Sequence, residues 1–425
     1  MHKELDITLD GLSKVEGHAE LEVKVSDGKV TTAKLMINEN KRFFTQAIKG
    51  QHFRSVSQMV SRICGTCSIA HQMACIEAVE NALDVKPSPQ TKALRNLAMH
   101  GLMIRDHALH LYLFCMPDIY GKDSVLEFEG PLHELVHDAF DVKAAGNALS
   151  TLVAGRSVHP PYPQVGGFSR VPSDDEITPV LKQLQSIRPK VLELIRIFDE
   201  CSFVHERDVR SVALANNDYN FLEGEIHNSE GLCTPESLLW EHLNRVVIPY
   251  SQATAFQFEG NAYVVGAAAR MNLNSHSLHP QTRKDAASAL AKFPTKNAFH
   301  NNLAQAVEIL HCIDRSMDTL SMAKFRPEPP PAIVPKQSSG VGVIEAPRGT
   351  LYYMLDIAAD GKIRFGNLVI PTAQNQIMME RDIRTLVPTL LHLPKERIEL
   401  EIEKLLRAYD PCMSCASHFL KVRWT

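Results

Sequence analysis

The chain has 425 residues, of which 44% are hydrophobic, and a formal net charge of −4 at pH 7. A chain of this length can bury a large core, and its slightly acidic charge gives no basic surface of the kind that binds nucleic acid. No apolar run is long enough to span a membrane, and no signal peptide is recognisable at the N-terminus. We therefore expect a cytoplasmic protein with no direct membrane span and no nucleic-acid partner.

The beginning of the chain has the pattern of a β-hairpin. Two runs rich in apolar residues, 21–25 and 30–37, flank the turn-forming pair Asp27-Gly28. Apolar residues then recur at helical spacing from 68 to 83, which predicts a helix directly after Cys67. The helix dipole would favour the ionised form of the Cys67 thiol.

Most of the remaining chain has helical periodicity. The segment 207–256 has no clear period, and we expect an irregular insertion there. A proline-rich connector precedes a second predicted hairpin, formed by 351–357 and 362–370. The expected helices cover roughly residues 91–116, 131–153, 175–206, 281–295, 298–323, 375–392 and 395–408. The expected fold is mostly α with small β hairpins, as one large helical body.

Two Cys-x-x-Cys pairs stand almost a whole chain apart, Cys64 with Cys67 and Cys412 with Cys415. If the pairs meet in space, they form a four-thiolate site, and thiolates suit zinc, iron, copper or nickel rather than calcium or magnesium. The chain has nine cysteines, an odd number, and four of them have metal-ligand spacing. This usage favours reduced thiols over a disulfide framework.

Two simpler metal sites compete with this interpretation. A structural zinc ion accepts four cysteines, but its pairs are usually about 15–20 residues apart, whereas 344 residues separate Cys67 from Cys412. His100, His107 and His110 would share one helix face and could bind a metal with His133 or His137. Such histidines more often bond to neighbouring side chains.

The sequence around each cysteine pair resembles the two signatures of the large, catalytic subunit of nickel-iron hydrogenases. The first signature is Arg62-Ile-Cys64-Gly-Thr-Cys67-Ser-Ile-Ala-His71, and the second is Asp410-Pro-Cys412-Met-Ser-Cys415-Ala-Ser-His418. Four weaker strings occur in the family's order, so the resemblance extends from residue 14 to residue 418. They are Lys14-Val-Glu16-Gly17-His18, Gly155-Arg156-x-x-His159-Pro160, Glu345-Ala-Pro347-Arg348-Gly349 and Pro371-Thr372-Ala-Gln-Asn375.

The resemblance implies reversible cleavage of H2 into protons and electrons at a Ni-Fe centre. By this analogy Cys64 and Cys412 are terminal nickel ligands. Cys67 and Cys415 bridge nickel to an iron that carries carbon monoxide and cyanide. A related scaffold that has lost the metal is the alternative, but such relatives dispense with the four cysteines, which this chain retains.

The resemblance also implies roles for residues around the centre. Glu16 matches a glutamate that passes protons to and from a thiolate, and Arg348 matches an arginine above the metals. Pro347 and Thr372 would border the cofactor, with the Thr372 hydroxyl bonding to a cyanide ligand. The remaining expectations are that Asp410 pairs with Arg348, that His71 bonds to a bridging sulfur, and that Asp106 assists catalysis.

One departure from the family pattern concerns magnesium. Family members commonly have a glutamate at the position of Thr45, and this glutamate helps to bind a magnesium ion with the histidine that is His418 here. Magnesium prefers oxygen ligands in octahedral geometry, and a hydroxyl is a weaker ligand than a carboxylate. We therefore expect a weakened or absent magnesium site at His418.

The other five cysteines are dispersed and lack the spacing of an iron-sulfur site. Electrons would therefore leave through a separate iron-sulfur small subunit. The resemblance is strongest to cytoplasmic, multi-subunit hydrogenases whose flavin-containing, diaphorase-type subunits reduce NAD(P) or another soluble carrier. It also implies nickel-insertion proteins and a maturation protease, which would leave a domain of residues 1–418 and remove the tail, 419–425.

Overall fold

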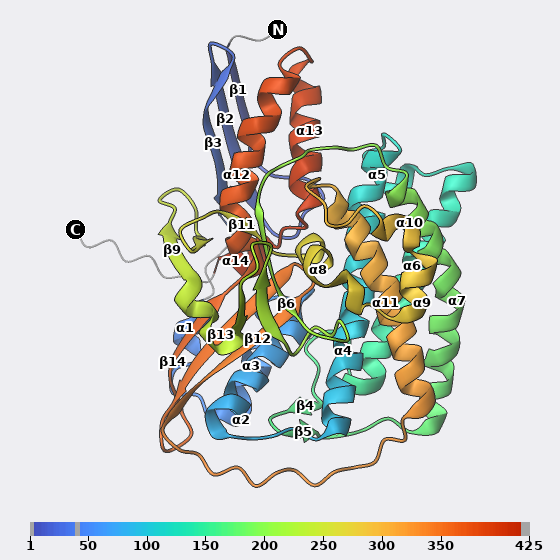
Figure 1. Cartoon of the computed structure of the whole chain (residues 1–425), viewed down its shortest axis with the longest axis vertical. Coiled ribbons are helices and arrows are strands. Elements are labelled where there is room, and N and C mark those ends of the chain that lie inside the picture. The colour runs from blue at the N-terminus through green and yellow to red at the C-terminus, as the bar shows by residue number, and fades with distance from the viewer. Residues whose placement is uncertain (1–3, 39–42, 418–425) are drawn as a thin grey trace, which may run out of the picture.

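The computed structural model describes residues 4–38 and 43–417. These residues form a mostly helical molecule with five small sheets, as expected from the sequence. Figure 1 shows the long helices α4, α6, α7 and α11 on one side and the larger sheets on the other.

Four long helices form a bundle in which α4 contacts α6 and α11, and α7 also contacts both α6 and α11. Gly101 of α4 and Gly146 of α6 lie at their crossing, where a side chain on either residue would collide with the backbone of the other helix. The bundle helices are α4 (Pro89–Ala108), α6 (His133–Ala154), α7 (Asp174–Asp199) and α11 (His300–Met322).

Local sequence signals explain where the bundle helices begin and end. Ser88 caps α4 by accepting a hydrogen bond from the Thr91 amide, and Pro89 occupies the first turn, where no amide donor is needed. A Ser173–Glu176 capping box starts α7. The predicted helix 175–206 ends early, at Asp199, because the following segment bonds in an extended form to the Asn297 side chain.

The predicted helix 91–116 is α4 continued by a π-helical segment, η1 (Leu109–Cys115), and the short helix α5 (Met116–Ile119). Such π-helical segments often occur at functional sites. The predicted helix 281–295 is instead divided at Ala286 into α9 (Pro280–Asp285) and α10 (Ala287–Leu290), because Ala286 leaves helical geometry.

Both predicted hairpins are confirmed, and each gains a third strand. The N-terminal sheet has the order β1 (Leu5–Leu9), β2 (Ala19–Ser26), β3 (Lys29–Ile37). The second sheet has the order β12 (Ser338–Ala346), β13 (Gly349–Ile357), β14 (Ile363–Val369). Strand β12 packs on helix α3 (Ser68–Leu83), and a side chain at Gly342 would collide with the Ala74 backbone.

The expectation of an irregular segment at 207–256 is wrong, because this segment contains four strands and the start of a fifth. Strand β6 is buried on both faces, so it shows no alternation of polar and apolar residues. One sheet has the order β11 (Tyr263–Val264), β6 (Arg210–Ala215), β7 (Glu225–Asn228), β8 (Cys233–Pro235). A second pairs β9 (Leu243–Val247) with β10 (Thr254–Phe258), and a third pairs β4 (Pro163–Gln164) with β5 (Gly167–Phe168).

The C-terminal helices return the chain to its beginning. Helix α12 contacts strand β3, and the short helix α14 contacts α12. A parallel backbone bridge joins Glu16 to Cys412, and the Met413 amide donates to the Glu16 carbonyl oxygen at 2.8 Å. The remaining helices are α1 (Phe44–Ala47), α2 (Phe53–Val60), α8 (Ala267–Asn274), α12 (Pro371–Leu390), α13 (Lys395–Ala408), α14 (Met413–Ala416) and the short η2 (Val125–Glu127), η3 (Gly130–Leu132), η4 (Glu236–His242) and η5 (Ser275–Ser277).

Candidate metal centre

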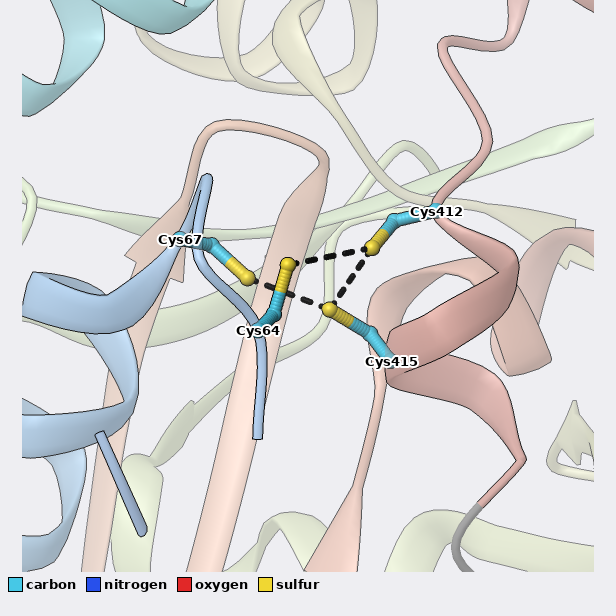
Figure 2. A group of neighbouring side chains, drawn as sticks. All are labelled: Cys64, Cys67, Cys412 and Cys415. Atoms are coloured by element: carbon cyan, nitrogen blue, oxygen red, sulfur yellow. Dashed lines mark hydrogen bonds between the residues drawn. The ribbon is translucent and has the colours of Figure 1, made fainter. Parts of the chain in front are cut away.

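The two cysteine pairs meet, as their spacing predicted. Cys64 and Cys67 come from the loop before α3, and Cys412 and Cys415 come from the start and body of α14 (Figure 2). The Sγ atoms of Cys67 and Cys415 are 3.1 Å apart, and those of Cys64 and Cys412 are 3.6 Å apart. All four sulfur atoms lie within 4.8 Å of one another, close enough to share metal ligation.

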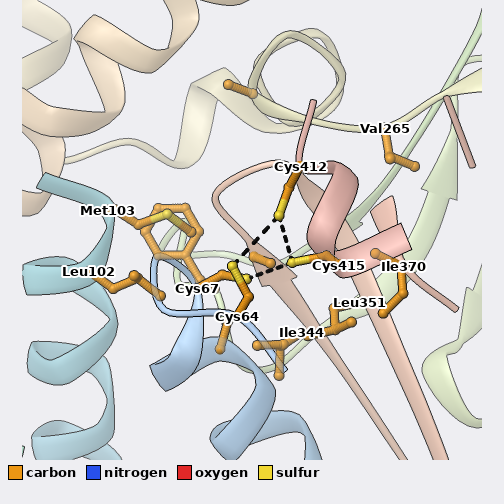
Figure 3. Packing of buried hydrophobic residues seen from close by; sticks show 14 of the residues in the cluster. Cys64, Cys67, Leu102, Met103, Val265, Ile344, Leu351, Ile370, Cys412 and Cys415 are labelled. Carbon is orange, nitrogen blue, oxygen red and sulfur yellow. Dashed lines mark hydrogen bonds between the residues drawn. The ribbon is translucent and has the colours of Figure 1, made fainter. Parts of the chain in front are cut away.

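The four cysteines are 1–5% exposed and lie among apolar side chains that include Leu102, Met103 and Val265 (Figure 3). Burial raises the pKa of the Cys412 and Cys415 thiols well above the ordinary value, whereas contacts with the other thiols lower the pKa of Cys64. The protein alone therefore favours only part of the set as thiolates. Four buried thiolates need a compensating positive charge, which metal ions supply.

Hydrogen bonds outside the sulfur cluster hold each cysteine pair. The Thr66 hydroxyl lies 2.9 Å from the Cys64 sulfur, and the Arg105 guanidinium donates to the Thr66 carbonyl oxygen at 2.6 Å. The Thr372 hydroxyl accepts a hydrogen bond from the Cys412 amide at 2.8 Å. Sequence reasoning did not identify Arg105, although this residue directly precedes Asp106.

Glu16 lies against the second cysteine pair. Its Oε2 atom is 2.9 Å from the Cys412 sulfur and 3.3 Å from the Ser414 amide. Gly17 has a φ of +81°, and a side chain there would lie 2.8 Å from the Ser414 amide nitrogen, so glycine permits this approach. Burial, and then the negative Cys64 thiolate, raise the pKa of Glu16 above its usual value. Glu16 is half-buried and so links the sulfur cluster to the outer part of the molecule.

Arg348 lies in the two-residue turn between β12 and β13. Its guanidinium donates to Asp106 at 2.8 Å and pairs with Asp410 at 3.1 Å, so the predicted ion pair with Asp410 is present. Burial opposes the charge, but the two carboxylates outweigh it and raise the pKa of Arg348 well above its usual value. Among the described residues, the buried Nε atom of Arg348 has no hydrogen-bond partner.

Arg270, which the sequence analysis did not single out, fixes this turn. Its guanidinium donates to the carbonyl oxygens of Ala346 and Pro347, at 3.0 and 3.1 Å. The same guanidinium forms ion pairs with Glu308 and Glu345, and all three side chains are buried. Glu345 belongs to the predicted motif, whereas Arg270 stands outside every motif.

A small cavity of about 10 Å³ borders the sulfur atoms, about the volume that one water-sized group needs. Its lining includes Cys67, Cys415, Pro347, Arg348 and Thr372. Because the Thr372 oxygen accepts from the Cys412 amide, the hydroxyl hydrogen is left to donate elsewhere. The cavity is therefore lined by soft sulfur ligands and by two residues, Arg348 and Thr372, that each have a spare hydrogen-bond donor. This lining fits a nickel-iron pair with small ligands.

His71 also lines this cavity. Its Nδ1 atom is 2.7 Å from the Tyr353 hydroxyl, a partner that the sequence did not suggest. Burial lowers the pKa of His71 to about 4, so the ring is neutral at pH 7. The expected bond from the other ring nitrogen to a bridging sulfur stays a prediction.

The competing histidine site is not supported in the described part of the chain. His100 bonds to Ser316, His107 to Glu308 and His110 to Gln305, at 3.0, 2.9 and 2.6 Å. These contacts satisfy the histidines separately, as buried imidazoles require. His110 also lies 3.8 Å from Asp410, so it supports the partner of Arg348.

Some predictions fall outside the described residues. His418 and the tail 419–425 belong there, so the magnesium and cleavage expectations stay predictions. Thr45 lies in helix α1. No described helix combines the length and apolar character that crossing a membrane would require.

The sequence model of the nickel-dependent hydrogenase family matches residues 42–129 and 219–418. Sulfhydrogenase 2 subunit alpha of Pyrococcus furiosus is 32% identical over 98% of this chain and 100% of its own length. The NAD-reducing hydrogenase HoxS subunit beta of Cupriavidus necator is 26% identical over 97% of this chain and 95% of its own length.

Solved structures show the same fold. A crystal structure of an NAD+-reducing [NiFe]-hydrogenase in the H2-reduced state has a TM-score of 0.90 and 25% identity, covering 98% of this chain and all of that one. The Ni-Fe-Se hydrogenase from D. vulgaris Hildenborough has a TM-score of 0.79 and 21% identity, covering 98% of this chain and 100% of that one, and supports the fold alone.

Proposed function

Since the chain belongs to the nickel-dependent hydrogenase family and has its large-subunit fold, we propose the roles of individual residues in its reaction, the reversible cleavage of H2. The observation that carries the proposal is the convergence of four cysteine sulfurs with Glu16 and Arg348 beside them. Cys64, Cys67, Cys412 and Cys415 would together hold the nickel-iron centre, whose iron would carry carbon monoxide and cyanide ligands as the family resemblance implies. When bound, this centre supplies the redox chemistry that separates H2 into protons and electrons.

Glu16 moves the proton. Its carboxylate oxygen is 2.9 Å from the Cys412 sulfur, within reach for direct transfer. Burial raises the pKa of Glu16 above its usual value, which favours a carboxyl group that can hold a proton beside the sulfur. Because Glu16 is half-buried, it can pass this proton outward.

Arg348 and Thr372 orient the small ligands in the cavity. The Nε–H of Arg348 and the hydroxyl hydrogen of Thr372 are the spare donors of two residues that line the cavity. Asp106 and Asp410 hold the guanidinium from two sides and so fix the direction of Nε. Pro347 completes the wall, and His71 is oriented by Tyr353 toward the same space.

The electrons leave through a partner. The described cysteines outside the centre are scattered and do not form an iron-sulfur ligand set among themselves. Relatives named as subunits of sulfhydrogenases and of an NAD-reducing hydrogenase support an assembly of several subunits. That these include an iron-sulfur small subunit and flavin-containing subunits is the part of the proposal that comes from the family resemblance of the sequence. A cytoplasmic location, nickel-insertion proteins and a maturation protease also come from this resemblance. Because Thr45 offers a hydroxyl where family members commonly have a carboxylate, the proposal includes a weak or absent magnesium site at His418.

Metal analysis combined with infrared spectroscopy tests this proposal. We expect about one nickel and one iron at the four cysteines, with infrared bands from metal-bound carbon monoxide and cyanide. A stoichiometric zinc ion without these bands would establish a structural zinc site instead. A chain free of metal after anaerobic isolation with its maturation proteins would point to a scaffold.

A further inference from the structure

A second group of metal-ligating side chains lies on strands β7 and β8, outside the four-cysteine centre. The Cys233 sulfur is 3.2 Å from Glu225 Oε2 and 3.4 Å from His227 Nε2. The three ligand atoms all lie within 4.8 Å of one another. No motif in the sequence analysis included these residues.

The strand register explains why the three side chains meet. His227 and Cys233 are directly opposite each other in the antiparallel pair, so they project from the same face. Glu225 precedes His227 by two residues and therefore shares that face. The connecting turn is fixed by Asn228, whose side-chain oxygen accepts from the amides of Glu230 and Leu232, each at 2.9 Å.

The spacing of the ligand atoms suits a tetrahedral metal ion. With metal–sulfur bonds of about 2.3 Å and metal–nitrogen bonds of about 2.05 Å, tetrahedral geometry separates the two ligand atoms by about 3.6 Å. The observed separations of 3.2 and 3.4 Å from the Cys233 sulfur need only small adjustments. Glu225 and Cys233 are exposed and His227 is half-buried, so an ion can reach them from solvent.

The charge of the group also favours a divalent cation. In the described residues no lysine or arginine forms an ion pair with Glu225, so its charge is available to a metal ion. Ionisation of Cys233 would supply a second negative charge, while His227 binds as neutral imidazole. Two negative ligands would neutralise a divalent ion at this exposed position.

We propose that Glu225, His227 and Cys233 bind one divalent transition-metal ion of the zinc class, with its fourth position open to solvent. Sulfur, imidazole nitrogen and carboxylate oxygen are the donors that zinc accepts in proteins. The Cys233 thiol loses its proton to solvent as the sulfur–metal bond forms. This site is independent of the hydrogenase reaction.

The bound ion would tie an edge strand to its neighbour. Strand β8 is the edge of the sheet β11-β6-β7-β8 and has only three residues. Glu225 and Pro235 also line a larger cavity beside α3, with a volume of about 360 Å³. Metal binding would therefore stabilise one wall of this cavity and slow amide exchange in residues 225–235.

Cobalt titration of the nickel-loaded enzyme, with its partner subunits and a phosphine reductant, tests the site. We expect the enzyme to bind one added equivalent of Co²⁺ and to show a thiolate-to-cobalt charge-transfer band. Zn²⁺ should then displace the Co²⁺ and remove the band. Amide exchange in residues 225–235 should be slower with the metal bound. Cys233→Ser should abolish the band and weaken Co²⁺ binding by about tenfold or more. Glu225→Gln should weaken binding while retaining the band.

Cys201→Ser is the matched control, because Cys201 is a partly exposed cysteine outside this group. It should keep both the band and the affinity of the unmodified enzyme. All three variants should oxidise H2 at the unmodified rate, since none of the residues touches the Ni-Fe centre. The proposal is overturned if the unmodified enzyme shows no charge-transfer band, or if Cys233→Ser and Glu225→Gln both bind Co²⁺ as tightly as Cys201→Ser.

Discussion

Glu16 Oε2 lies 2.9 Å from the Cys412 sulfur, although the two residues are 396 positions apart in the chain. The parallel bridge between their backbones fixes this distance, because it sets both residues in register before either side chain is considered. The proton carrier and the metal ligand are therefore assembled by one backbone contact. This backbone contact forms only in the completed fold.

The first prediction concerns proton transfer at this contact. Glu16→Gln should retain nickel and iron but lower H2 oxidation by about 10²-fold or more, because the amide keeps the shape and cannot carry the proton. H2/D2 exchange and metal content, measured on the same preparation, check this. Glu20→Gln, a change in a nearby carboxylate of β2, should leave both unchanged. Normal exchange in Glu16→Gln would remove Glu16 from the relay.

The second prediction concerns the direction of the Arg348 guanidinium. Arg348→Lys keeps the charge, but an ammonium group cannot span Asp106 and Asp410 while directing a separate donor into the cavity. We expect activity to fall by about 10- to 100-fold with metal content retained, and the infrared bands of the small ligands to shift. Arg364→Lys, at an exposed ion pair with Asp356, is the control. Unshifted bands would show that Arg348 does not contact these ligands.

The cysteine pairs could be identified from sequence because ligand spacing is a local property. Arg105, Arg270 and Tyr353 could not, since their importance comes from hydrogen bonds to Thr66, Pro347 and His71 that only tertiary packing creates. No periodicity or spacing marks such residues in a single sequence. The nearest indication in the sequence is that Arg105 directly precedes Asp106, a residue of the predicted site.

The same difference between local pattern and tertiary packing explains which helices and strands can be predicted from the sequence. Helix α3 was predictable because its apolar residues recur at helical spacing. Strand β6 was not, because five of its six residues are buried and no polar face alternates with an apolar one. Strand β12 was obscured by Gly340 and Gly342, which weaken the strand pattern but let the strand approach α3.

The third prediction concerns the end of the chain. By analogy with the family, the tail 419–425 is removed after nickel insertion, so active enzyme should end at His418. Intact-mass measurement of the nickel-loaded, active protein checks this, with the chain made without its maturation protease as the uncleaved reference. An active protein whose mass still includes Thr425 would mean that this chain matures without cleavage.

The fourth prediction concerns two half-buried carboxyls, Glu77 and Glu236, which line the cavity beside α3. Burial, and then Glu223, raise the pKa of Glu236 to about 7, and burial raises that of Glu77 as well. In the unfolded chain Glu236 releases its proton near its ordinary pKa of 4.5. The native state therefore binds more protons than the unfolded state between about pH 4.5 and 7. Stability should fall as the pH rises through this range.

Glu236→Gln tests this fourth prediction, since a neutral amide removes the cost of ionising the half-buried carboxyl. At pH 8 the variant should be more stable than the unmodified enzyme by about 1 to 3 kcal/mol, and below pH 4.5 the difference should vanish. Thermal unfolding across this pH range measures both effects. Glu129→Gln, at an exposed glutamate, should give the same pH profile as the unmodified enzyme. A Glu236→Gln curve parallel to the unmodified curve at every pH would show that Glu236 has the same pKa in the folded and unfolded chain.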